Sequence, residues 1–301
     1  MFYQLDQFGF RALWSPYLFL FILVITGLFF FVTIKKRHWF EGTEKLTKKQ
    51  GALFVTAALL VYILKGSPID LLSHLMFTFH MIQMAFLLLL VPQLLISAIP
   101  IWMWKKILSL SIIKHIFKLF TKPIVALICF NGLFSFYHIP FIFDKVKTNI
   151  WYHSIGTTIL FIFALFMFWP LLNKVEKSPL QGLWKVGYLF ANSVLITPAC
   201  ALIIFNNELI YAAYSNYQSW IQSLTLCVPP EVISSLQLSG PEMFNIMPPL
   251  YDQQSGGVLM KILQEFFYGI ILYKVLTEWY RKEQQQGPDP INQQWRNIYK
   301  N

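Results

Sequence analysis

Long apolar runs separated by short polar connections make up most of this chain. A bilayer core about 30 Å thick is crossed by roughly 20 apolar residues in a helix. In these runs apolar residues face all round the helix, as expected within a membrane. The pattern predicts seven membrane-spanning helices, at residues 13–34, 51–64, 69–99, 123–143, 150–172, 183–205 and 257–279.

The distribution of lysine and arginine predicts the orientation, because cytoplasmic connections carry the excess of both residues. The first, third and fifth connections and the C-terminal tail are rich in them. The opposite side has only Arg11, Lys65, Lys145 and Lys147, and the long connection 206–256 has neither residue. We therefore expect an all-α, polytopic membrane bundle of seven transmembrane helices, with the N-terminus outside and the C-terminus in the cytoplasm. Residues 1–280 form one membrane domain, and residues 281–301 form a polar cytoplasmic tail.

Composition supports a multi-pass protein of the cell (plasma) membrane. Hydrophobic residues make up 56% of the chain and charged residues 13%, whereas soluble domains carry about 25% charged residues. The net charge of +10 lies in the connections and forms no basic face for nucleic acid. The cysteines are far apart and form no CxxC motif, which argues against a disulfide framework or a zinc ribbon. Motifs of serine hydrolases, zinc proteases and nucleotide-binding loops are absent from the sequence, so we expect no enzyme.

Histidine and methionine residues interrupt the apolar run 69–99. Orientation places His74 and His80 in the outer half of the membrane, and His138 and His153 reach the same level from two other helices. In one continuous helix, Met76, His80 and Met84 would stack along a single face. Imidazole and thioether together suit copper, and thioether particularly suits Cu(I). The sequence thus predicts a copper site with candidate ligands His74, Met76, His80, Met84, His138 and His153.

A second group of residues lies next to these ligands. We expect it to orient them or to dock a partner protein; its members are Met81, Gln83, Asp252, Gln253, Gln254 and Met260. Simpler interpretations stay open. Methionine often fills gaps in a core, and histidine often bonds across membrane helices. Paired histidines on facing helices can also ligate haem, and an oxidoreductase acting on haem would show a Soret band.

Four segments resemble the CtaG family, the multi-span cytochrome c oxidase assembly factors of Gram-positive and other bacteria. They are HMIQMAFLLLLVPQLLISAIP (80–100), DQQSGGVLM (252–260), GFRALWSPY (9–17) and FMFWPLL (166–172). The resemblance implies a copper-handling assembly factor for the dinuclear copper centre of the oxidase's second subunit. The residues of this chain that match the family motifs are His80, Met81, Gln83 and residues 252–254, and the resemblance implies that they take part in this role. The family pattern has a histidine where this chain has Met84, which leaves a softer ligand or none.

Two further functions stay open at this point. One is a permease for copper or another small solute, although residues 86–95 of the third run are almost purely apolar apart from Gln93. The other is a metal-free scaffold for oxidase subunits, whose histidines serve helix packing. Metal content, uptake into vesicles and oxidase assembly distinguish the three.

Overall fold

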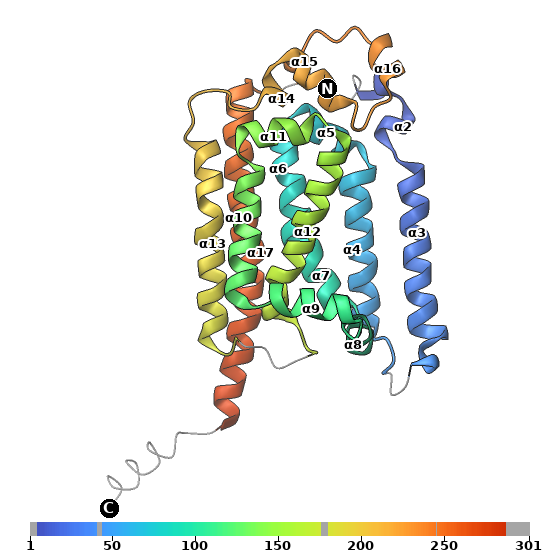
Figure 1. Ribbon diagram of the computed structural model, residues 1–301, viewed down its shortest axis with the longest axis vertical. Helices are drawn as coiled ribbons and strands as arrows, with labels where there is room; N and C mark the ends of the chain where they lie inside the picture. Colours follow the sequence, from blue (N-terminus) through green and yellow to red (C-terminus); the bar gives the residue numbers. More distant parts are fainter. Residues whose placement is uncertain (1–4, 41–43, 176–179, 245, 287–301) are drawn as a thin grey trace, which may run out of the picture.

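The computed structural model describes residues 5–40, 44–175, 180–244 and 246–286. Every regular element in these ranges is a helix, and the longer helices run side by side as a bundle (Figure 1). Most of the predicted tail, residues 287–301, lies outside the described residues.

Five helical segments are long and apolar enough to cross a membrane. They are α3 (Pro16–Phe30) with its π-helical continuation Phe31–Lys35, α4 (Lys48–Gly66), the segment Phe77–Ala98, α12 (Ile150–Leu172) and α13 (Leu183–Ile204). The predicted bounds of α12 are confirmed, and those of α13 differ by one residue at its end. The short second run extends in both directions to become α4.

Two further predicted spans take a less regular form. The helices α9 (Ser111–Phe120) and α10 (Pro123–Tyr137) pass the same test only as a pair bent by 84°. The last predicted span lies inside α17 (Pro249–Gln286), which packs between α6 (Phe77–Ala85) and α13. The structure therefore has five to six candidate spans, with α17 in addition as a long bundle helix.

The prediction of one continuous helix over 69–99 was wrong. The helix α5 (Pro68–Leu75) ends at Met76, whose backbone is extended (φ −132°, ψ 133°), and α6 starts one residue later. The break is held from α17, because the Asp252 carboxylate accepts the backbone N–H groups of Phe77 at 2.7 Å and Thr78 at 3.2 Å. A π-helical turn, Phe86–Leu90, then joins α6 to α7 (Val91–Ala98).

The prediction for 123–143 was wrong at its end. The helix α10 stops at Tyr137, and α11 (Pro140–Lys147) starts as a separate helix. Proline disfavours helical backbone at the residue before it, and Ile139 is indeed non-helical (φ −64°, ψ 126°).

The two ends of the bundle are built differently (Figure 1). At the end that we call the cap end, short helices cover the bundle, and the predicted outer connection supplies half of them. They are α2 (Phe10–Leu13), α5, α11, α14 (Ala212–Ser215), α15 (Tyr217–Leu224) and α16 (Pro230–Ser235), with 3-10 turns Asp6–Phe8 and Pro241–Met243. The other end carries α8 (Ile101–Leu108), α9 and the turn Arg37–Trp39.

Adjacent glycines let α17 approach two helices closely. A Cβ on Gly256 would lie 2.7 Å from Phe77 Cδ1 on α6, and one on Gly257 would lie 2.8 Å from Ile204 Cγ1 on α13. Real Cβ atoms do not approach so closely, so these positions require glycine. The close contact brings Asp252 to the start of α6.

Candidate functional site

His80 lies in the first turn of α6, directly below the break in the chain. Its side chain is fully buried, and neither ring nitrogen has a hydrogen-bond partner among the described residues. Buried polar groups are normally paired, because an unmade hydrogen bond in an apolar surrounding costs about 1–3 kcal/mol. Two orphaned nitrogens on one ring therefore require an explanation.

His138 faces His80 from the C-terminal end of α10. The two ring centroids are 6.2 Å apart, with the ring planes inclined by 52°. His138 Nδ1 lies 2.8 Å from the carbonyl oxygen of Phe134. A carbonyl can only accept, so Nδ1 carries the proton and Nε2 keeps its lone pair. That Nε2 is also buried and without a partner. A bond from the other ring nitrogen to a backbone carbonyl is the usual arrangement of metal-binding histidines.

Aromatic rings close the space around this pair. Phe143 lies edge-on to His80 at 5.1 Å between centroids, and Phe77 lies at 5.9 Å. Tyr137 lies nearly parallel to His80 at 6.2 Å, and its buried hydroxyl has no partner within the described ranges. The pair therefore sits in a dry, aromatic surrounding in which any bound cation exchanges slowly with water.

A second pair, His74 and His153, joins α5 to the first turn of α12. Their ring centroids are 5.5 Å apart. Lys147 of α11 is fully buried beside them, with Nζ 3.2 Å from the Ser73 carbonyl and 3.4 Å from His74 Nδ1. Burial lowers the pKa of Lys147 to about 7. Burial, and next the charge of Lys147, lower the pKa of His74, so this imidazole is neutral at neutral pH.

Lys147 was not among the predicted site residues, because its charge counted only toward the orientation. Tyr211 and Tyr214 of the outer connection were missed as well. The Tyr211 hydroxyl donates to the His138 carbonyl at 2.8 Å, and the Tyr214 hydroxyl donates to the Ser73 carbonyl at 2.6 Å. One sequence feature could have indicated these two residues: the pair of tyrosines three positions apart in YAAY, within a connection that has neither lysine nor arginine.

The residues predicted to orient the ligands or dock a partner hold the cap in place. Asp252 caps α6, as described above. The Gln253 side chain accepts from Ile210 N at 3.0 Å and donates to the Glu208 carbonyl at 3.1 Å, and Gln254 donates to the Asn206 carbonyl at 3.1 Å. These bonds fix the start of the outer connection against α17.

The remaining predicted residues are separated from the histidine pairs or packed in apolar surroundings. Gln83 donates to Asp70 Oδ1 at 2.8 Å and to the Leu64 carbonyl. Met81, Met84 and Met260 lie in the main apolar core. Met76 packs in the cap core with Leu72 and Trp220, so the predicted stack of Met76 on His80 and Met84 does not form.

Binding of a metal ion at this level requires donor side chains that converge on one point. Among residues 5–40, 44–175, 180–244 and 246–286, no three side chains of His, Cys, Asp or Glu converge on one point. What converges is a pair. Two imidazoles that bind one ion through nitrogen at about 2.0 Å have ring centres roughly 6 Å apart, and the centroids of His80 and His138 are 6.2 Å apart. The ring separation of this pair is therefore the one expected for two imidazoles that share an ion, and their free nitrogens have no other partner among the described residues.

Comparison with known proteins gives one match. Searches of the curated proteins and of the solved structures found none. The family model described as cytochrome c oxidase caa3 assembly factor (Caa3_CtaG) matches residues 27–282, which include both histidine pairs and the start of α17. A match over this much of the sequence shows that the chain belongs to the Caa3_CtaG family of cytochrome c oxidase assembly factors.

Proposed function

We propose that this assembly factor binds one Cu(I) ion between His80 and His138 and presents it to the copper-carrying second subunit of the oxidase. The observation that supports the proposal is the set of orphaned nitrogens: both on His80, and Nε2 on His138. Cu(I) is a closed-shell ion that accepts two ligands, and imidazole and thioether suit it. Met81 and Met84 lie in the same core and are candidates for a weak third contact.

The proposal includes the membrane topology. The cap end faces outward, because its connections carry few lysine and arginine residues while the α8–α9 end carries many. Seven spans with the N-terminus outside then follow if α9–α10 and α17 both cross the membrane. In this orientation the pair lies on the side of the membrane where the oxidase subunit takes up copper.

Copper content of the purified protein tests the proposal. The unsubstituted protein, loaded with Cu(I) under reducing conditions and desalted, is expected to retain about one copper per chain, and His80→Ala and His138→Ala to retain little. His115→Ala is the matched control, since His115 is exposed on α9 and bonds only to the Ser111 carbonyl. Equal copper in all four proteins would overturn the assignment.

X-ray absorption of the loaded protein identifies the ligands. A pair of imidazoles gives a nitrogen shell at about 2.0 Å, whereas a methionine ligand adds sulfur near about 2.3 Å, by analogy with zinc. The same copper assay with His74→Ala, His153→Ala, Met76→Leu and Met84→Leu tests the other predicted ligands one by one.

A metal-free scaffold is the second candidate, because no three His, Cys, Asp or Glu side chains converge within the described part of the chain. In that case the histidines serve only packing. A cell that carries the double substitution His80→Ala and His138→Ala would then assemble a copper-replete oxidase normally. Under the copper proposal, the same cell makes oxidase that lacks copper in its second subunit.

A further inference from the structure

An apolar cavity of about 490 Å³ opens sideways from the bundle between α3, α4, α7 and α12. Its walls include Phe21 and Ile25 of α3, Phe54 and Val61 of α4, Leu95 of α7 and Phe161 of α12. All four helices belong to candidate membrane spans. The cavity, which we call the lateral groove, therefore lies at membrane depth.

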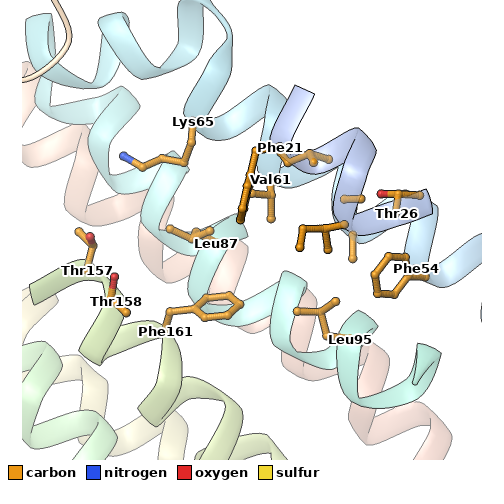
Figure 2. Close-up of a pocket in the computed structure, with 14 residues that line it drawn as sticks. Phe21, Thr26, Phe54, Val61, Lys65, Leu87, Leu95, Thr157, Thr158 and Phe161 are labelled. Atoms are coloured by element: carbon orange, nitrogen blue, oxygen red, sulfur yellow. The ribbon is translucent and has the colours of Figure 1, made fainter. Parts of the chain in front are cut away.

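One end of the lateral groove is polar. Figure 2 shows Lys65, Thr157 and Thr158 together at that end, while Thr26, Phe54 and Leu95 lie toward the other. The same three polar residues also line a second cavity of about 300 Å³, which we call the head pocket. The two cavities thus adjoin at these three residues, the apolar one at membrane depth and the polar one at the cap end.

The head pocket contains an unpartnered buried side chain. His153 is only 9% exposed, lines the pocket, and has no hydrogen-bond partner for either ring nitrogen among the described residues. It does not belong to the proposed copper pair. The hydroxyl groups of Ser154 and Thr158 line the same pocket. Such a set of groups, left open toward a cavity, suits a ligand with several hydrogen-bond acceptors.

The head pocket is lined by one cation and one carboxylate, Lys65 and Asp70. Lys65 Nζ lies 2.9 Å from Asp70 Oδ1, and the same oxygen also accepts from Gln83 at 2.8 Å. Oδ1 of Asp70 is therefore shared by two donors. The Lys65 ammonium has further protons to donate, so a phosphate in the pocket accepts from Lys65 in competition with Asp70. Lys147 packs behind His74, which lines the pocket.

The volume of the lateral groove, about 490 Å³, suits a small molecule or a single lipid chain. Cavities of about 300–1,000 Å³ are those of small molecules. A quinone ring fits the head pocket poorly, because Leu226 is its one apolar lining residue.

We propose that the two adjoining cavities together bind one anionic phospholipid, with an acyl chain in the lateral groove and the phosphate in the head pocket between Lys65, His153 and Thr158. This site is separate from the proposed copper pair, so either proposal can fail without the other.

Native mass spectrometry of the full chain tests the site. The protein, stripped of lipid in detergent, is titrated with phosphatidylglycerol, and phosphatidylcholine is titrated in parallel. We expect one tightly held phosphatidylglycerol per chain and binding of phosphatidylcholine weaker by about tenfold, which corresponds to about 1.4 kcal/mol. Inorganic phosphate at millimolar concentration is not expected to displace the lipid, because it lacks the chain.

Three variants locate the bound lipid. Lys65→Met removes the head-pocket cation, Lys65→Arg restores it, and Ala58→Phe fills the lateral groove. The first and third are expected to weaken phosphatidylglycerol binding about tenfold, and the second to preserve it. Lys261→Met is the matched control, because Lys261 also pairs with a carboxylate at 2.9 Å and has a similar side-chain exposure, 28% against 25% for Lys65.

Several results would overturn the proposal. Equal binding of the two lipids would show that the phosphate environment is not recognised, and undiminished binding by Lys65→Met or Ala58→Phe would place the lipid elsewhere. Co-purification of a quinone in place of a phospholipid would assign the cavity to that ligand. Lys65→Met should elute from gel filtration at the volume of the unsubstituted protein, which shows independently of copper that the variant is folded.

Discussion

Asp252 is expected to hold the start of α6, and with it His80, by accepting two backbone N–H groups from a helix far away in the sequence. The first N–H groups of a helix have no partner within the helix, and those of Phe77 and Thr78 are buried with their residues. Asp252→Ala leaves both donors unsatisfied. At about 1–3 kcal/mol for each, the loss amounts to roughly 2–5 kcal/mol of unfolding free energy once the weaker bond at 3.2 Å is discounted.

Asp252→Asn separates hydrogen bonding from charge. Its amide oxygen still accepts one N–H, so about half of the loss from hydrogen bonding is expected. The substitution also removes the favourable interaction of the negative charge with the helix N-terminus, a further loss of about 0.3–1 kcal/mol. Unfolding by SDS in mixed micelles, followed by tryptophan fluorescence, measures both variants. If alanine and asparagine both unfold at the SDS fraction of the unsubstituted protein, Asp252 does not cap α6.

Three further predictions concern other contacts. Gly256→Ala is expected to lose about 1–3 kcal/mol of stability by overpacking against Phe77. In Gly269→Ala, on the same helix, the added Cβ meets no atom within 4 Å, so this variant should gain up to about 1 kcal/mol. Equal SDS midpoints of the two variants would contradict this. Asp144→Ala removes the acceptor of the backbone N–H groups that start α14, at 3.1 and 2.9 Å, so faster amide exchange is expected in that helix and nowhere in α12. The free energy of unfolding should rise from about pH 7 to about pH 10, with a slope of at most about 1.4 kcal/mol per pH unit. The reason is that Lys147 loses its proton near pH 7 in the folded protein and at about 10.4 in the unfolded chain. Lys147→Met should abolish the slope, and an unchanged slope would refute the assignment.

The sequence predicts best those features that depend on neighbours along the chain. The bounds of α12 were predictable, because its apolar run follows Asn149, whose side chain accepts the N–H groups of Trp151 and Tyr152. The helix boundary before Pro140 was predictable too, since proline disfavours helical backbone at the residue before it. It was not predicted because the apolar run continues past it.

Features that depend on distant residues were not predictable. The break at Met76 depends on Asp252, 175 residues away from Phe77, so periodicity alone favoured a continuous helix. Orientation did bring four histidines to one level, yet it could not say which helices are neighbours. The pairing of His80 with His138, and of His74 with His153, required the packing order of the bundle.

The break at Met76 also sets the hydrophobic length of the third span. A continuous helix over 69–99 would be about 46 Å long and would extend well beyond a hydrocarbon core of about 30 Å. The segment Phe77–Ala98 instead rises about 33 Å, which matches that core with little tilt. His80 therefore stands one turn inside the boundary between lipid and the cap, rather than in the middle of the hydrocarbon. Under the copper proposal, an ion that enters from the cap end would pass only that turn of the helix to reach His80.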